Sequence, residues 1–323
     1  MSRENLDVLK REIPLWDYLQ GLGWGPVRSL RDGRRMGLCP LHQDHKPSFL
    51  LDPRKNLFYC YGCGRGGDVI RLAELYHHVR FLEAVAILRH WRGWLSLHQE
   101  VTAFYRLQLH RHTEAVAYLC QRGIRSPEVI EHMRIGYAPG RCLRAWLVQL
   151  GYPLADLRQA GLVTADGYDA FSHRIVFPLE TNLYGRSIAV SAPPHRFLPN
   201  SKGGLYGWDF VHHCSDVILV EGLFDYAVLW QAGFRHVTCS LGNHLNARQF
   251  RQLCDRTRTV YLAFDTDGNG SGQQASKRLA DRLRAEGIAA RRVVLPEGHD
   301  PNSFFMQGGA TLDFQTLLET AQP

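Results

Sequence analysis

The sequence predicts a mixed α/β protein, α+β overall, with an N-terminal zinc ribbon and a C-terminal parallel sheet flanked by helices. Two observations carry this prediction. Cysteine and histidine residues form two closely spaced pairs early in the chain, and short apolar runs alternate with helical patterns in its last third. Between them lies a basic α+β segment. The expected domains are residues 1–97, 98–212 and 213–323.

The composition indicates an ordinary folded protein, with 45% hydrophobic and 11% aromatic residues. Lys and Arg number 38 against 31 Asp and Glu, which gives a formal net charge of +7 at pH 7. A basic balance of this kind suits a polyanionic partner. The chain opens on polar residues and has no apolar run long enough to span a bilayer, so we expect a cytoplasmic protein with no membrane partner.

The hydrophobic patterns define the expected elements. Before a boundary expected at 93–100, these are a helix over 6–19 broken at Pro14, a strand over 56–59, and helices from Asp68 and over 81–91. After it we expect a helical region to 162, strands over 174–179 and 185–191, and a loop over 193–207. In the last third the expected strands are 217–220, 237–241, 259–264 and 289–295, and the expected helices are 225–232, 247–254 and 273–286. Such alternation predicts a parallel sheet.

The early cluster reads Cys39-Pro-Leu-His42 and Cys60-Tyr-Gly-Cys63. Each pair can place two ligands on one tight turn, and two such turns complete a tetrahedral Zn²⁺ site with no open position for water. His45 is a rival to His42, although its spacing from Cys39 is long for such a turn. The alternative is that the cysteines are buried thiols or a redox pair.

The predicted ribbon is surrounded by basic residues, among them Arg35 and Lys46, with Phe58 and Tyr59 between them. Basic groups would contact phosphates, and exposed rings could stack on unpaired bases. The alternative for each of these residues is a solvated charge or a ring in the core.

Acidic residues follow the expected parallel strands. Glu221 comes directly after one strand, and Asp225 is one helical turn further on. Asp265 and Asp267 follow another strand, and Asp300 follows the last. Because ligands of open parallel sheets bind beyond the carboxyl ends of the strands, these carboxylates predict a Mg²⁺ or Mn²⁺ site.

Two other interpretations apply to the segment from Asp265 to Gly270. It matches the first half of an EF-hand calcium loop, but Ser276 stands where a bidentate Glu is needed and a strand precedes it. It could also be a solvated acidic turn.

Together these motifs resemble bacterial DnaG-type primases. The resemblance rests on the cysteine pairs with Lys46-Pro-Ser-Phe49, on 118–124, 135–139 and 174–178, and on Glu221-Gly-Leu-Phe-Asp225 with Phe264-Asp-Thr-Asp267. It implies a zinc-binding domain, a polymerase core and a Toprim catalytic domain. It also implies a DNA primase, a nucleotidyltransferase that makes short RNA primers on single-stranded DNA from ribonucleoside triphosphates.

The resemblance implies a role for each matching residue. Glu221 would be the catalytic general acid/base or the carboxylate that organises the metals. Asp265 and Asp267 would be catalytic metal ligands, supported by Asp225 and Asp300. The groups expected to contact template or nucleotide phosphates are Arg174, Arg196, Lys202, Arg35 and Lys46.

The chain departs from the family pattern at three places. The family commonly has Asp-Pro-Asp where this sequence has Asp300-Pro-Asn302, and its Gly-Gly-Arg is replaced near Ser191. Since little sequence follows residue 305, we expect no counterpart of the family's helical domain that docks on the replicative helicase. The sequence therefore suggests a compact primase of a plasmid, phage or mobile element that works without the usual helicase contact. A replicative helicase or an element-encoded replication protein remains a candidate partner. The alternatives are a Toprim nuclease and a non-catalytic single-stranded-DNA-binding protein.

Overall fold

The computed structural model describes residues 3–189, 192–199, 201–255, 257–266 and 271–323. The chain divides into two compact units, Met1–Gln99 and Glu100–Pro323, and each is described by itself. Within the described residues, no helix combines the length and the apolar character that crossing a membrane requires.

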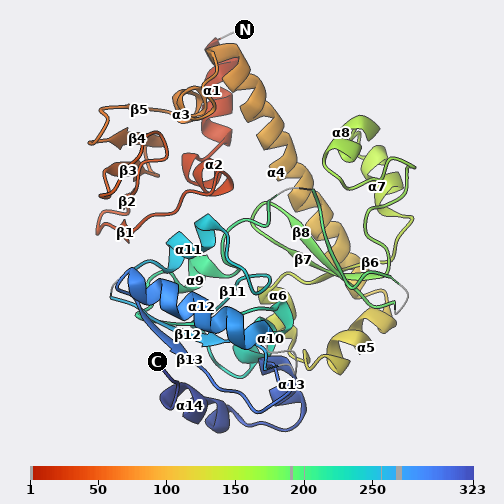
Figure 1. Ribbon diagram of the computed structural model, residues 1–323. Coiled ribbons are helices and arrows are strands. Elements are labelled where there is room, and N and C mark those ends of the chain that lie inside the picture. The colour runs from red at the N-terminus through yellow and green to blue at the C-terminus, as the bar shows by residue number, and fades with distance from the viewer. Residues whose placement is uncertain (1–2, 190–191, 200, 256, 267–270) are drawn as a thin grey trace. The chain divides into compact units, whose positions relative to one another are not determined.

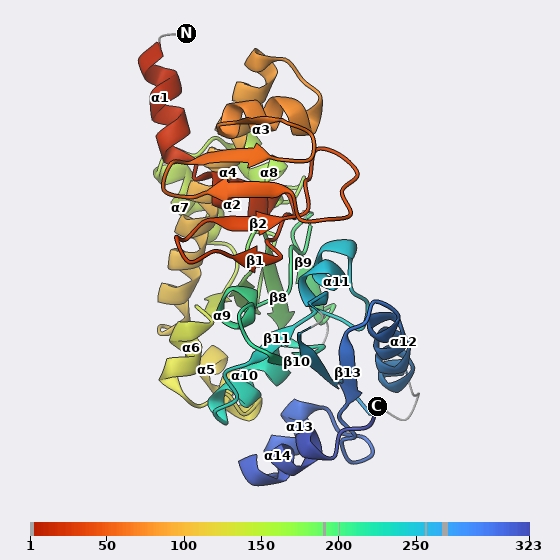
Figure 2. The ribbon, with the colours of Figure 1, turned by 90° about the vertical axis from the view of Figure 1, so that its left-hand side faces the viewer.

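The first unit is built on a five-stranded antiparallel sheet in the order β1-β2-β3-β4-β5, whose strands lie edge to edge (Figure 2). Its strands are β1 (Arg28–Ser29), β2 (Arg35–Gly37), β3 (Phe49–Asp52), β4 (Leu57–Cys60) and β5 (Gly66–Gly67). Its helices are α1 (Arg3–Glu12), α2 (Leu15–Gly21), α3 (Val69–His77) and the beginning of α4 (Phe81–Leu109).

The core of this unit forms because the strands alternate and the helices are amphipathic. In β4, Phe58 and Cys60 are buried while Leu57 and Tyr59 are exposed. Phe58 packs in one cluster with side chains of β3, α2 and α3. Asp68 caps α3 as predicted, since its carboxylate accepts hydrogen bonds of 3.0 Å from the backbone N–H groups of Ile70 and Arg71.

The boundary predicted at 93–100 agrees with the division of the chain between Gln99 and Glu100, but a helix and not a loop spans it. Helix α4 continues through it as one element from Phe81 to Leu109 (Figure 1). Gly93 lies inside this helix, where a Cβ would meet no atom within 4 Å. A single glycine costs a helix only about 1 kcal/mol, which the flanking turns can offset.

The second unit begins with helices and an antiparallel sheet in the order β6-β7-β8-β9. The helices are α5 (Thr113–Gln121), α6 (Pro127–His132), α7 (Leu143–Gln149) and α8 (Leu154–Gln159), and the strands are β6 (Gly136–Ala138), β7 (Arg174–Pro178), β8 (Leu183–Ser187) and β9 (His195–Phe197). The prediction was wrong at β6, which lies in the region expected to be helical, and at β9, which lies in the loop expected over 193–207, since three residues are too few to show a period. Both are strands because they pair with β7 and β8.

The rest of the second unit contains the predicted parallel sheet, in the order β11-β10-β12-β13. Its strands are β10 (Asp216–Val220), β11 (Val237–Cys239), β12 (Thr259–Ala263) and β13 (Ala289–Arg292). The helices are α9 (Trp208–Val211), α10 (Leu223–Gln231), α11 (Ala247–Leu253), α12 (Ser271–Ala285), α13 (Pro301–Met306) and α14 (Thr311–Glu319). All four strands and three helices of the predicted alternation are therefore confirmed.

The two faces of the parallel sheet belong to different clusters. Ile218 and Val220 of β10 pack with α10 and with side chains of β6 and β7. Leu219, which points the other way, packs with side chains of α11 and α12, and α12 lies across the sheet (Figure 1). Since the first cluster is shared between the two sheets, the basic segment and the acidic edge of the parallel sheet belong to one packed unit.

Candidate metal centre and acidic pocket

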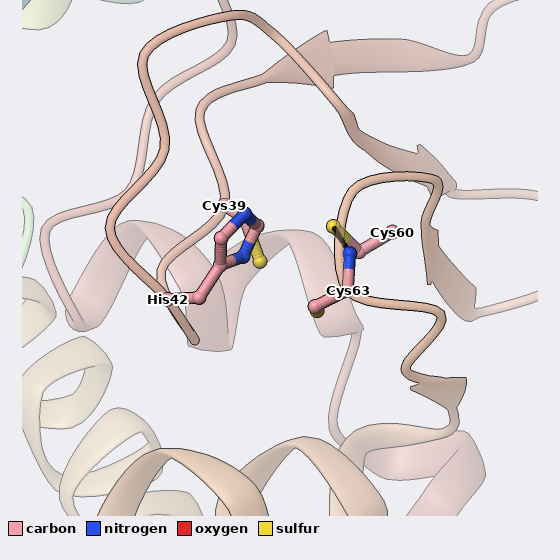
Figure 3. Close-up of side chains that lie close together, drawn as sticks. All are labelled: Cys39, His42, Cys60 and Cys63. Atoms are coloured by element: carbon pink, nitrogen blue, oxygen red, sulfur yellow. Dashed lines mark hydrogen bonds between the residues drawn. The ribbon is translucent and has the colours of Figure 1, made fainter.

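The predicted zinc ligands come together in the first unit. The ligand atoms of Cys39, His42, Cys60 and Cys63 lie within 4.8 Å of one another, and the side chains turn toward one another (Figure 3). Cys39 and His42 lie between β2 and β3, whereas Cys60 ends β4 and Cys63 follows it. In each turn a backbone N–H donates to the first sulfur at 3.4 Å, from Leu41 to Cys39 and from Cys63 to Cys60. His45 is exposed and is not part of the group.

The surroundings of these four side chains fit Zn²⁺. The Nδ1 atom of His42 is buried, and no described residue hydrogen-bonds to it. A buried ring nitrogen with a lone pair is suited to a metal. Burial raises the pKa of the Cys39 thiol to about 12, so that without a cation this sulfur keeps its proton. A bound Zn²⁺ would hold it as the thiolate.

Asp44 and Ser48 form hydrogen bonds that hold the predicted zinc ligands in place. The Asp44 carboxylate accepts hydrogen bonds from the Cys39 backbone N–H at 2.8 Å and from the Ser48 hydroxyl at 2.6 Å. The Ser48 oxygen in turn lies 3.3 Å from the Cys60 sulfur. Asp44 also lies 3.9 Å from Nε2 of His42. Such outer partners orient metal ligands. The sequence prediction did not include them.

In the second unit, the predicted carboxylates meet at one pocket of about 550 Å³. Glu221 follows β10, Asp225 lies in the first turn of α10, Asp265 follows β12, and Asp300 precedes α13. All four line the pocket, as the positions of the strand ends predicted. Asp267 lies outside the described residues. The other lining residues are Arg122, Tyr184, Arg186, His195, Phe197, Lys202, Gly222, Leu223, Phe224, Leu241 and Gly242.

Asp225 is the most buried of these acids, at 5% exposure. Its carboxylate accepts backbone N–H hydrogen bonds from Gly222 at 3.1 Å and from Asn302 at 3.0 Å. Burial, and then the charges of Asp300 and Asp265, raise the pKa of Asp225 well above its ordinary value. A carboxylate in this environment is stable as an anion when a cation neutralises it, so the donor set fits a divalent metal such as Mg²⁺.

Neighbouring backbone fixes the other acids. One carboxylate oxygen of Glu221 accepts the N–H of Asp265 at 3.3 Å, which links the ends of β10 and β12. Thr266 is buried, and its hydroxyl donates toward the carbonyls of Pro296 and His299 at 2.6 and 2.8 Å. These hydrogen bonds link the segments that follow β10, β12 and β13, and thereby fix the positions of the carboxylates.

The pocket lining also includes the cations Arg122, Arg186 and Lys202, here called the basic wall. Lys202 lines the pocket as expected and donates to the Leu241 carbonyl at 3.1 Å. Arg122 and Arg186 line it too, and we did not predict them as site residues. Arg122 lies in the motif 118–124 that supported the family resemblance, so this motif could have indicated it as a site residue.

His195 links Arg186 of this wall to Tyr184 through hydrogen bonds. The Nη1 atom of Arg186 lies 3.0 Å from Nε2 of His195, and the Tyr184 hydroxyl lies 2.7 Å from Nδ1. Because an arginine can only donate, Nε2 accepts and Nδ1–H donates to Tyr184. Burial, together with Arg186 and three further cations, lowers the pKa of His195, in keeping with this neutral form.

The remaining predicted phosphate contacts lie elsewhere. Arg174 is 4% exposed, and its guanidinium donates to backbone carbonyls, to Gly185 at 3.2 Å and to Pro193 at 2.9 Å. It thus fastens the loop after β8 to the sheet and does not line the pocket. Arg196 is exposed on β9. In the first unit Lys46 is exposed, and the Arg35 guanidinium lies 3.4 Å from the centre of the Trp16 ring.

Three family models match consecutive parts of the chain. They are described as a CHC2 zinc finger (residues 4–103), the N-terminal domain of the DNA primase catalytic core (104–202) and a Toprim-like domain (218–305). The DNA primase of Aquifex aeolicus (strain VF5) is 30% identical over 98% of this chain and 71% of its own length. Further DNA primases match over 55% to 59% of their length.

Solved structures agree with these matches. The crystal structure of the Aquifex aeolicus primase, comprising zinc-binding and RNA polymerase domains, superposes with a TM-score of 0.64 at 28% identity, covering 99% of this chain and 86% of that one. A DnaG primase catalytic domain bound to single-stranded DNA gives a TM-score of 0.61 at 26% identity, covering 73% and 83%.

Fold and site together define a protein with a zinc ribbon and a Toprim-type acidic pocket. The chain belongs to the DnaG-type DNA primase family.

Proposed function

We propose that this protein is a DNA primase that makes short RNA primers on single-stranded DNA by metal-dependent nucleotidyl transfer. The observation that carries the proposal is the pocket itself. Four carboxylates line it together with Arg122, Arg186 and Lys202 in a cavity of about 550 Å³. A site that binds both metal ions and a polyphosphate needs this combination of charges.

The reaction requires no nucleophile from the protein. The 3′ hydroxyl of one nucleotide attacks the α-phosphate of the next, a new P–O bond forms, the bond to the β-phosphate breaks, and pyrophosphate leaves. Mg²⁺ or Mn²⁺, held by Glu221, Asp225, Asp265, Asp267 and Asp300, would supply charge neutralisation at the phosphates. Glu221 is the group proposed to receive or relay the proton of the hydroxyl.

The basic wall binds the triphosphate. Arg122, Arg186 and Lys202 are the cations of the pocket, and their charge would hold the β- and γ-phosphates and favour the departing pyrophosphate. The protein contributes positioning and electrostatics, which together account for large parts of an enzymatic rate enhancement.

The zinc ribbon would contact the single-stranded template. Tyr59 and Tyr61 are 45% and 65% exposed, and their ring centres lie 5.1 Å apart, so both rings are available to unstacked bases. Phe58, which we had considered for this role, is buried and belongs to the core. Lys46 and, in the other unit, Arg196 are exposed cations proposed to contact template phosphates.

The test is primer synthesis on single-stranded DNA of varied sequence with labelled ribonucleotides and Mg²⁺ or Mn²⁺. Asp265→Ala should abolish synthesis, whereas Asp281→Ala, an exposed carboxylate on α12, should leave it unchanged. Cys60→Ser should give few or wrongly started products. Synthesis that survives in Asp265→Ala at the full rate contradicts the proposal.

The same assay separates the two alternatives. Shortening of the DNA without nucleotide incorporation, lost in Asp265→Ala, would indicate a Toprim nuclease. Binding of single-stranded DNA with neither reaction would indicate a non-catalytic protein.

A further inference from the structure

Asn302 does not face the acidic pocket. It stands in the first turn of α13, two residues after Asp300, and is 4% exposed. Asp300 lines the pocket, whereas Asn302 is not among the lining residues. A metal ion held by the pocket carboxylates would therefore not meet its side chain.

The Asn302 amide is instead bound to Arg122. Its Nδ2 donates to the Arg122 carbonyl at 2.7 Å, and its Oδ1 accepts from the Arg122 Nε at 3.3 Å. Arg122 is the C-cap residue directly after α5, and carbonyls at the end of a helix lack partners within their own helix. The amide thus satisfies this carbonyl and fixes the direction of the Arg122 side chain at once.

Arg122 is held from the pocket side as well. Its guanidinium carbon lies 4.4 Å from the centre of the Phe224 ring, and both residues line the pocket. The backbone N–H of Asn302 also donates to the Asp225 carboxylate at 3.0 Å. Asn302 therefore connects Arg122 of the basic wall to Asp225, the most buried acid of the pocket.

An aspartate could not make the same contacts. A carboxylate has no N–H to donate, so one of its oxygens would face the Arg122 carbonyl oxygen at hydrogen-bond distance. It would also add a negative charge beside buried Asp225. The amide is the group that donates to the carbonyl and accepts from the guanidinium together.

We propose that Asn302 is a positioning residue that holds the Arg122 guanidinium at the pocket for the triphosphate of the incoming nucleotide, and that it is not a metal ligand. This inference rests on the proposed function, because it names the residue that orients part of the same site. It predicts that a change at Asn302 weakens nucleotide binding and leaves the metal requirement as it is.

The experiment compares Asn302→Ala, Asn302→Asp, Arg122→Ala and the double variant. Gln231→Ala is the matched control, because the Gln231 amide binds the same turn, with Gly123, Arg125 and Ser126, and does not hold Arg122. The measurements are KM and kcat for nucleotide in primer synthesis, the metal concentration for half-maximal rate, and ATP binding in the presence of Mn²⁺.

Asn302→Ala is expected to raise KM about tenfold, corresponding to one lost charge-assisted contact, with kcat changed less than threefold. Asn302→Asp should be no better than Asn302→Ala. The double variant should be no worse than Arg122→Ala, and Gln231→Ala should keep the wild-type KM.

A tenfold shift in the metal requirement with an unchanged KM would overturn the inference and make Asn302 a ligand. Additive losses in the double variant, or a KM in Gln231→Ala raised as much as in Asn302→Ala, would also overturn it. If the wild-type protein makes no primer, the proposed function fails, whereas ATP binding by the same variants still decides whether Asn302 acts through Arg122.

Discussion

Gly272 offers a sharp test of the acidic pocket because local and tertiary reasoning predict opposite results. It lies in the first turn of α12, where alanine would favour the helix by about 1 kcal/mol. A Cβ at this position would lie 2.9 Å from a carboxylate oxygen of Glu221 and closer still to the carbonyl oxygen of Asp265. A carbonyl cannot rotate away as a side chain would, so α12 or the segment after β12 must move.

The size of this movement sets the expected effect. The contact to Glu221 must lengthen by about 0.5 Å, and the contact to the Asp265 carbonyl by more, to reach the 3.4 Å at which ordinary contacts begin. Catalytic groups tolerate about 0.5 Å of displacement, and a misplacement of about 1 Å can cost about 100-fold in rate. We therefore expect Gly272→Ala to lower kcat in primer synthesis by about 10- to 100-fold, or about 1.4 to 2.7 kcal/mol.

Gly93→Ala is the matched control. The same methyl group enters the interior of α4, where it meets no atom within 4 Å. Its activity should equal that of the wild type, and its stability should rise by up to about 1 kcal/mol. Circular dichroism shows whether both variants are folded. A folded Gly272→Ala protein with a kcat within threefold of the wild type would refute the reasoning.

Three further predictions concern single carboxylates. Asp44→Ala should lower zinc affinity about tenfold, measured by transfer of zinc to a chelating dye, and an unchanged affinity would show that Asp44 does not brace the ligands. Because the folded-state pKa of Asp225 lies above its ordinary 3.8, protein without added Mg²⁺ or Mn²⁺ should lose stability relative to Asp225→Asn as pH rises from about 3.8 to that raised value. Urea unfolding across pH measures this difference, and a constant difference contradicts it. Asp68→Ala should cost about 1 kcal/mol by loss of the α3 cap, whereas Asp68→Asn, which keeps the cap and loses the ion pair to Lys10, should stay near wild type in thermal unfolding.

Short-range spacing made the ribbon and the parallel sheet predictable. Two ligands on one turn are fixed by neighbouring residues, so the pattern of Cys39 and His42 already indicates a knuckle. The regular alternation after residue 213 likewise specified the strands, and the sheet then brought Glu221 and Asp265 to one edge. In these segments the positions of the candidate metal ligands follow from the order of neighbouring residues along the chain.

Long-range packing decided what the sequence left undetermined. Arg174 and Arg122 are both arginines in family-like motifs, yet the first is fastened to backbone carbonyls and the second lines the pocket. No local pattern separates them, because the difference lies in which distant carbonyls and rings surround each guanidinium. The sequence also could not decide between Phe58 and Tyr59. Successive side chains of β4 point to opposite faces, so Phe58 packs in the core with α3 and Tyr59 is exposed.

The sequence by itself predicted the class of protein, the cluster of three cysteines and one histidine, and the acidic strand ends, because each depends on residues close together in the chain. The tertiary structure alone decided which cations line the acidic pocket, the hydrogen bonds of Asp44 and Ser48 around the zinc ligands, and the bond between Asn302 and Arg122. That last contact joins residues 180 positions apart. The contact forms because packing of the core brings the C-terminal end of α5 next to the first turn of α13.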